Sequence, residues 1–184
     1  MNIQWFQHSD NWQDVKNAAM NTIGKAAGKY PNDAWKLRLL RAEHSPIRKL
    51  IFSWRWEDLP YWVSVHFVRH KIGIEHFVKT QRSDRTGIPR DELPQGALVT
   101  HECTANAQAM ITISRKRLCS AAAPETRQAW QLVKDQVAKC EPALAHCMVR
   151  ECVYRGFCPE MFSCGYTKTE AYARERETYL SDEL

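Results

Sequence analysis

The sequence predicts an α+β fold, because strand patterns fill its first half and helix patterns its second. Residues 47–56 alternate along the chain and are rich in isoleucine and tryptophan, as strands are. Residues 105–118 and the segment after Pro124 repeat apolar residues at helical spacing. The 184 residues suffice for one domain, 1–184, and are too few for two. We expect a mixed β-sheet packed against helices, with a peripheral tail from about residue 167.

The first third of the chain is predicted to form one helix and two strands. Apolar residues at helical spacing predict a helix over residues 11–28, with Asp10 as its N-cap and Gly28 as its stop. Residues 35–43 alternate as a strand, and residues 47–56 form a second strand after a Ser-Pro break. Both strands would belong to the predicted sheet.

The middle of the chain is less regular. Pro60 favours a helix start, and residues 61–73 can run as a helix to Gly73. A strand is the alternative there, because β-branched residues are frequent. Residues 74–82 can form another strand, and residues 83–96 form a charged surface loop of a length that often carries function.

Helices should follow in the second half. Thr104 can cap a helix over residues 105–118, and Pro124 can open a second helix. A short third helix is expected after Pro142. These helices would supply the layer that covers the sheet.

Composition and charge narrow the function without fixing it. A net charge of +5 favours an anionic partner such as a nucleotide, RNA or a folate tail. The sequence has no signal-peptide pattern and no run of about eighteen apolar residues, so we expect a cytoplasmic protein outside the membrane. The seven cysteines are then expected to be reduced thiols. No Walker loop, GxSxG motif or glycine-rich dinucleotide fingerprint occurs, so a nucleotide cofactor would be held in another way.

Cationic side chains stand out at two places. Arg69, His70, Lys71 and Arg82 lie among aromatic and aliphatic residues and could grip phosphates. Charges of this kind are more often simply solvated. The sequence alone leaves both interpretations open.

The predicted helix over residues 105–118 carries the second set. Asn106 and Arg117 are eleven residues apart, which returns them to nearly one face, roughly 16 Å apart along the axis. One extended ligand could touch both. The alternative is that Asn106 caps the helix and Arg117 is a solvated cation favoured by the helix dipole. Arg115 lies about 160° round the helix from Arg117 and is expected to tolerate lysine.

Metal binding is a weaker interpretation. His66 and His70 are four residues apart, but no HExxH glutamate lies between them. Cys152, Cys158 and Cys164 lack the CxxC pairs of common zinc sites. We expect buried thiols and no metal, with a structural zinc as the minority alternative.

Several segments together are similar to one family. Arg69-His70-Lys71 and, if one residue is inserted, Thr80-Gln81-Arg82 are similar to the two ends of RHRxxSxNExSxR, the signature of the flavin-dependent thymidylate synthases (ThyX). The positions between them depart from it, with Ile74 at the first serine, His76 at the asparagine and Phe77 at the glutamate.

Flanking segments extend this resemblance from about residue 43 to residue 166. NAQAMITISRKRLCSAAAPETR, which starts at Asn106, resembles the family's NxxxLxxFLxLR followed by AQxEIR, with Thr112 at a second flavin-contacting asparagine. EHSPIR is similar to HExPxEH, with His44 shifted by one position. CVYRGFCPEMFSCG resembles the cysteine-bearing tail of a small, often phage-encoded branch.

The resemblance implies roles for individual residues. It implies FAD binding by His44, Arg69, His70, Lys71, His76, Asn106 and Thr112. It implies binding of dUMP by His66, Thr80, Gln81, Arg82 and Arg117. Arg117, on the pyrimidine ring, is also the implied catalytic residue.

The same resemblance implies an activity. Reduced FAD would relay a one-carbon unit from methylenetetrahydrofolate to dUMP, giving dTMP, with NADPH as reductant, in a homotetramer. The alternatives are an enzyme of this fold that modifies another pyrimidine nucleotide, and a noncatalytic protein that binds nucleotides or nucleic acid. Nucleic acid is the less favoured partner.

Overall fold

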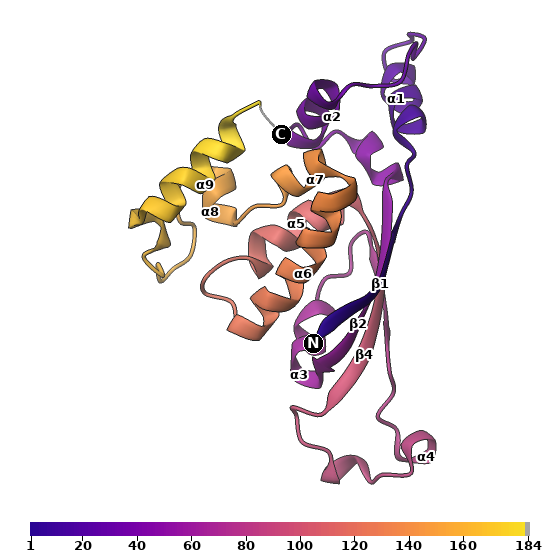
Figure 1. The fold of residues 1–184 in the computed structure, drawn as a ribbon, viewed down its shortest axis with the longest axis vertical. Helices are drawn as coiled ribbons and strands as arrows, with labels where there is room; N and C mark the ends of the chain where they lie inside the picture. Colours follow the sequence, from indigo (N-terminus) through magenta and orange to yellow (C-terminus); the bar gives the residue numbers. More distant parts are fainter. Residues whose placement is uncertain (183–184) are drawn as a thin grey trace.

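A four-stranded antiparallel sheet with helices on one face forms the centre of the molecule (Figure 1). The computed structural model describes residues 1–182. The strand order is β1-β2-β4-β3, so β2 and β4 are the inner strands. The strands are β1 (Asn2–His8), β2 (Ile51–Pro60), β3 (Ile74–Val78) and β4 (Leu98–Asn106). This arrangement confirms the predicted α+β class.

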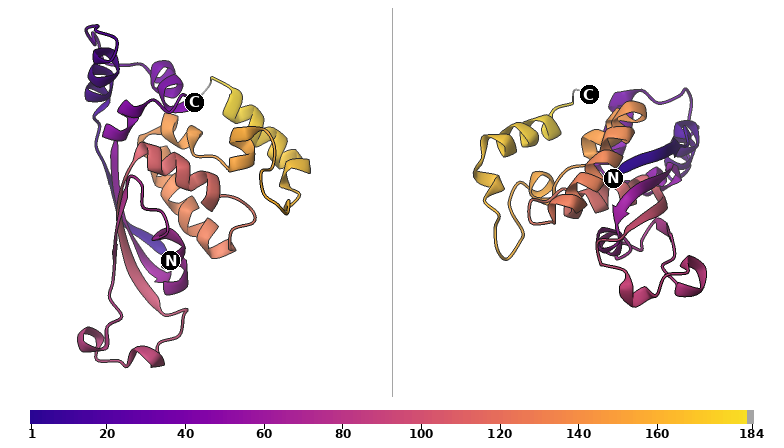
Figure 2. Two further views of the ribbon diagram at one scale, coloured as in Figure 1. Left: turned by 180° about the vertical axis from the view of Figure 1, so that it is seen from behind. Right: turned by 60° about the horizontal axis from the view of Figure 1, so that its bottom comes forward.

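The helices lie mainly on one side of the sheet, as the two views of Figure 2 also show. The α-helices are α1 (Trp12–Asn21), α2 (Asp33–Arg41), α3 (Tyr61–Phe67), α4 (Ser83–Thr86), α5 (Ala107–Arg117), α6 (Pro124–Cys140), α7 (Pro142–Cys147), α8 (Glu151–Arg155) and α9 (Glu170–Leu180). Short 3-10 helices are η1 (Ser45–Lys49), η2 (Arg90–Glu92) and η3 (Tyr166–Lys168). None of the helices in residues 1–182 has the length and apolar character that crossing a membrane requires.

The core lies between the sheet and α5 to α7. Alternate residues of β2 and β4 face it, which places His101 opposite Trp56 and Cys103 opposite Trp54. Trp56 stacks on Phe67 of α3, with ring centroids 4.7 Å apart. Burial of these large aromatic surfaces supplies much of the driving force for folding.

The other face of the sheet is polar and partly exposed. Arg55 of β2 forms an ion pair with Glu102 of β4 at 2.7 Å. Ser53 and Thr104, which are also paired across these strands, share a hydrogen bond of 2.9 Å. Thr104 therefore belongs to β4 and does not cap α5 as predicted.

Several predictions for the first third were wrong. The N-cap of α1 is Asn11 and not Asp10, and β2 begins at Ile51 and not at residue 47, because η1 precedes it. Residues 35–43 do not form a strand, because Asn32 accepts a hydrogen bond from Trp35 N and starts helix α2. Leu37 and Leu40 are three residues apart and are both buried on that helix. Helix α1 ends at Asn21, well before residue 28, and Gly24 then takes a left-handed conformation with φ of 66°.

The segment before β3 also differs from prediction. Helix α3 ends at Phe67, which leaves residues 68–73 as a loop. Gly73 closes this loop with φ of 74°, and a Cβ there would lie only 2.6 Å from Asn106 Nδ2. Asn106 caps α5 by accepting a hydrogen bond of 2.9 Å from Ala109 N. The loop and the start of α5 therefore pack as one unit.

Candidate functional site

Arg117 lies at the end of α5 and reaches across to the segment that precedes β3. Its Nε donates to His70 Nε2 at 2.8 Å, and its Nη2 donates to the His66 carbonyl at 2.7 Å. Within residues 1–182, Nη1 makes no hydrogen bond and no carboxylate forms an ion pair with Arg117. The side chain is thus oriented by its own chain but keeps an uncompensated positive charge. Arg117, His70 and His66 are called the Arg117 cluster below.

The two histidines of this cluster are neutral at neutral pH. Arginine can only donate, so His70 Nε2 must carry a lone pair and the proton must be on Nδ1. Burial, followed by the charge of Arg117, lowers the pKa of His70 to about 4. Burial also lowers the pKa of His66, whose Nδ1 lies 2.9 Å from Thr126 Oγ1. The positive charge of the cluster is therefore concentrated on the guanidinium.

A chain of hydrogen bonds links this cluster to the centre of the sheet. His76 Nε2 donates to the His70 carbonyl at 2.8 Å, so its Nδ1 accepts from His101 Nε2 at 3.0 Å. Cys103 Sγ lies 3.3 Å from the same His76 Nδ1. His101 is fully buried, and burial lowers its pKa to about 3. The chain is thus a neutral network that fixes the loop over residues 68–73 against β4.

Metal binding by this network was also considered. Among the described residues, His76, His101 and Cys103 form the one group whose potential ligand atoms all lie within 4.8 Å of one another. Their hydrogen bonds already account for both nitrogens of His76, and His101 is packed against Trp56 and Phe67. His101 Nδ1 is buried and has no hydrogen-bond partner among the described residues.

A groove beside the Arg117 cluster unites most of the expected cofactor residues. It has a volume of about 280 Å³, and we call it the basic groove. It is lined by Arg69, His70, Lys71, Ile72, Ala109, Thr112 and Ile113. Arg69, Lys71 and Thr112 are exposed, and Ile72 is 91% exposed. The groove thus presents two free cations and a hydroxyl beside an aliphatic wall.

Asn106, His76 and His44 have other positions. Asn106 and His76 lie next to the basic groove, but the amide caps α5 and the imidazole bonds within the network. The capping role anticipated as the alternative for Asn106 is confirmed. His44 lies at a separate hollow of about 300 Å³ between α1, α2 and η1. A single chain therefore does not bring His44 to the basic groove.

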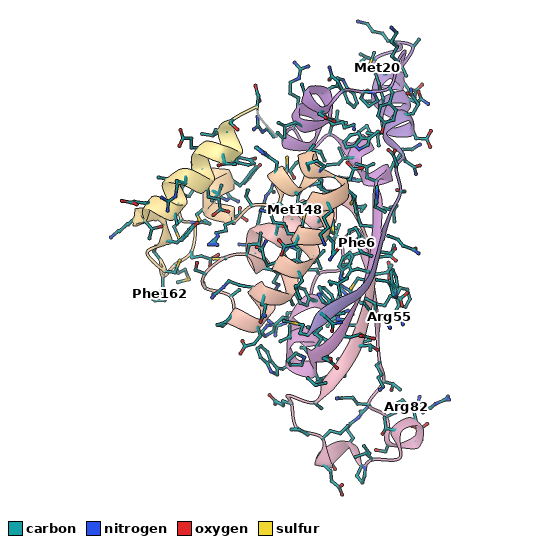
Figure 3. The ribbon with its side chains drawn as sticks, viewed as in Figure 1. Phe6, Met20, Arg55, Arg82, Met148 and Phe162 are labelled. Carbon is teal, nitrogen blue, oxygen red and sulfur yellow. The ribbon has the colours of Figure 1, made fainter. Side chains whose placement is uncertain are left out.

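The expected phosphate-binding residues lie at the far end of β3. Thr80 and Gln81 line a second groove of about 390 Å³ with residues 90–95, which we call the distal groove. Arg82, which is labelled in Figure 3, is exposed. It donates two hydrogen bonds of 2.9 Å to Asp84. The five residues of β3 extend over roughly 13 Å, and Thr80, Gln81 and Arg82 follow the end of this strand. His66 and Arg117 thus lie together, whereas Thr80, Gln81 and Arg82 lie apart from them in one chain.

Sequence reasoning missed two contributors near the site. His101 and Cys103 hold His76, and the alternation of Val99, His101, Cys103 and Ala105 was the available signal for their strand. Arg115, which was expected to tolerate lysine, forms an ion pair with Glu43 and lies over Tyr154, with the guanidinium carbon 3.6 Å from the ring centroid. No local pattern indicates this pairing, because Glu43 is 72 residues away in the chain.

Comparison with known proteins gives structural matches only. No family model and no curated protein matches the sequence. The structure is similar to a UMP/dUMP methylase, PolB, from Streptomyces cacaoi, solved with 5-Br dUMP, at 15% identity and a TM-score of 0.58. This match covers 85% of the present chain and 94% of the other.

A second match is to the flavin-dependent thymidylate synthase ThyX from Helicobacter pylori, solved with FAD and dUMP. The identity is 12% and the TM-score 0.62, with 82% of the present chain and all of the other covered. At such identities the likeness extends to the fold. The chain therefore has a ThyX-like α+β fold, in which the Arg117 cluster and the basic groove form the candidate site.

Proposed function

We propose that this protein is a ThyX-like enzyme that methylates dUMP to dTMP with FAD as cofactor. The observation that carries the proposal is the position of Arg117. It is a half-buried arginine with no carboxylate partner in the described chain, oriented by two hydrogen bonds and adjacent to a groove with two further cations. Buried charges are normally paired, so a site of this kind suits an anionic or strongly polar ligand.

The basic groove fits part of a flavin dinucleotide. Arg69 and Lys71 can neutralise phosphates, and Ile72, Ala109 and Ile113 offer an apolar wall for a ring. A groove of about 280 Å³ is at the lower limit for drug-sized ligands, so one chain would cover only a portion of FAD. When bound, FAD would supply the redox and one-carbon chemistry, with methylenetetrahydrofolate and NADPH as cosubstrates.

Arg117 would hold and polarise the pyrimidine. Its Nε and Nη2 are fixed by His70 and the His66 carbonyl, which leaves Nη1 to donate to a ring oxygen. A pre-oriented guanidinium stabilises negative charge that develops on the ring without reorganisation during the reaction. The neutral His70 supports this role, because it accepts from Nε and adds no competing charge.

The phosphate of dUMP would be bound by Thr80, Gln81 and Arg82. In one chain these residues lie at the opposite end of β3 from Arg117, so a second copy must bring its distal groove to the basic groove. Exposed apolar side chains next to both grooves, Ile72, Phe77 and Leu98, fit such an interface. We therefore propose that the active form contains more than one copy of the chain, and the resemblance to ThyX makes a homotetramer the expected assembly.

Another pyrimidine nucleotide is the second candidate substrate. The positions that answer the serine, asparagine and glutamate of the ThyX signature are here buried Ile74, internally bonded His76 and exposed Phe77. Three such changes next to the site alter the groups that a substrate or cofactor would meet. Comparing the folate-dependent turnover of dUMP with that of UMP and of dCMP distinguishes the two candidates.

Flavin content is the most direct test of the proposed function. Purified protein should show the absorption of FAD after incubation with it, and Arg69→Ala should lower the bound fraction several-fold because a phosphate partner is lost. Arg174→Ala is the matched control, since its side chain is 74% exposed on α9. Protein that binds neither FAD nor dUMP, or that is monomeric by light scattering with FAD present, would contradict the proposal.

A further inference from the structure

Four of the seven cysteines meet at one small cavity on the side of α5 away from the sheet. Cys119 follows α5, Cys152 lies in α8, and Cys158 and Cys164 lie in the loop over residues 156–165. The cavity has a volume of about 10 Å³, which is room for about one water molecule or one ion. We propose that this cavity is a structural zinc site with these four thiolates as ligands.

The loop that carries two of the cysteines has little else to hold it. Residues 156–165 form neither helix nor strand, and none of them is buried. Its large apolar side chains are exposed: Phe157 by 58%, Met161 by 93% and Phe162 by 87%. Apolar packing therefore does not explain why Cys158 and Cys164 turn towards Cys119 and Cys152. Zinc coordination does, because it fixes segments that lack a core of their own.

The four sulfurs would draw closer when a metal binds. No three of them lie within 4.8 Å of one another, whereas tetrahedral Zn–S bonds of about 2.3 Å require a closer approach. Gly156 and Gly165, with φ of 84° and 80°, form turns at the two ends of the loop. Metal binding would therefore require the loop over residues 156–165 to bring Cys158 and Cys164 closer to Cys119 and Cys152.

Charged side chains of both signs surround this cavity. A zinc ion with four thiolates carries a net charge of −2. Arg150, Glu151 and Glu160 line the cavity, and Lys116 pairs with Glu160 at 3.5 Å. Burial raises the pKa of Cys119 and of Cys152, so without a metal both remain thiols.

Metal analysis of the whole protein tests the proposal. We expect about one zinc per chain, by inductively coupled plasma mass spectrometry, in protein purified without a metal-affinity tag. Cys158→Ser and Cys164→Ser should each lower zinc at least tenfold. Cys140→Ser is the matched control, because this half-buried cysteine of α6 lies outside the cavity and should keep its zinc.

Cobalt gives an independent measurement if the serine variants fail to fold. Replacing zinc by Co²⁺ in the unmodified chain should produce intense thiolate charge-transfer absorption and the visible bands of a tetrahedral ion. Wild-type protein that takes up neither Zn²⁺ nor Co²⁺ would overturn the proposal. So would zinc that survives both serine changes but is lost in Cys103→Ala, or a Cys158–Cys164 disulfide found in metal-free protein by mass spectrometry.

Discussion

Arg115 and Arg117 lie two residues apart on α5, yet their surroundings have opposite characters. Arg115 forms an ion pair with Glu43 and stacks on Tyr154, so its charge is balanced and its plane is covered. Arg117 is bound by a neutral histidine and a carbonyl, and no carboxylate in the described residues balances it. The first arginine joins α5 to α8 and to the turn that follows α2, whereas the second faces a groove.

This difference separates two uses of a half-buried cation. Placing a charge away from water costs free energy, which a carboxylate can offset within the chain. Where neutral partners orient the cation and no carboxylate offsets that cost, an anionic or polar group of a ligand can offset it. Burial and the charge of Arg69 lower the pKa of Arg117, in line with an unbalanced positive site. The predictions below test whether the two arginines differ as this argument requires.

The largest effect is expected on ligand binding at Arg117. Arg117→Lys keeps the charge but replaces a fixed, planar set of donors by one mobile ammonium group. Binding of dUMP should weaken by about 2 to 4 kcal/mol, measured by calorimetry. The free energy of unfolding should change by less than about 1 kcal/mol, because lysine can still donate to the His66 carbonyl. Arg174→Lys, on the exposed face of α9, should alter neither quantity.

The effect at Arg115 should be on stability instead. Arg115→Lys removes the stacking on Tyr154 and weakens a pair whose side chains are only 14% and 20% exposed. We expect the free energy of unfolding to fall by about 2 to 3 kcal/mol in urea denaturation. Glu43→Gln should cause a similar loss, and affinity for dUMP should be unchanged in both. Equal ligand effects at positions 115 and 117 would refute the distinction.

Acid should destabilise the network that supports Arg117. The pKa of His101 is about 3 in the folded protein and 6.5 ordinarily, so the unfolded chain takes up a proton first as the pH falls. The contribution of neutral His101 to the free energy of unfolding is fully present above pH 6.5 and declines as the pH falls towards 3. From His101 alone we expect about 2 kcal/mol less stability at pH 5 than at pH 7.5.

The measurement is urea denaturation at the two pH values, with His101→Gln as the comparison. The histidines with lowered pKa near it, His76 and His70, act in the same direction. His101→Gln should reduce the pH dependence but not abolish it. A wild-type stability that is the same at pH 5 and pH 7.5 would show that His101 is not buried as a neutral group.

The smallest effect is expected at Arg82, which resembles neither arginine of α5. Its side chain is 61% exposed and pairs with Asp84 two residues away. Arg82→Ala should change the free energy of unfolding by less than about 0.5 kcal/mol. Its loss should nevertheless weaken dUMP binding in the assembled protein. If Arg82→Ala and Asp84→Ala lower dUMP affinity equally, the effect comes from the loop as a whole and not from a phosphate contact.

Local signals predicted the helices of the second half well. Pro124 begins α6 and Pro142 begins α7, because a proline at the first position loses no hydrogen bond. The signal for α2 was overlooked, since Trp35, Leu37 and Leu39 alternate like a strand while Asn32 and Leu40 indicate a helix. β4 was not predicted at all, although its alternation is regular, and its partners β2 and β3 lie far from it in sequence.

The site, like the fold, was predicted where local sequence determines it and missed where it depends on residues far apart in the chain. Arg69, His70 and Lys71 are consecutive, and Thr112 lies near Arg117 on one helix, so local sequence places each group correctly. Their meeting depends on the loop before β3 packing against α5, which is a long-range contact. The ion pair between Arg115 and Glu43 and the cavity shared by Cys119 and Cys164 also depend on long-range contacts.

The tight contact between Gly73 and Asn106 has a consequence for motion. Gly73 O accepts from Asn106 N at 2.9 Å, and no side chain fits at Gly73 without displacing the amide that caps α5. The loop cannot open while the first turn of α5 stays intact, so the two should unfold locally as one unit. In hydrogen exchange, the amides of Asn106 and Ala109 should therefore exchange at a common rate, and a ligand in the basic groove should slow both together.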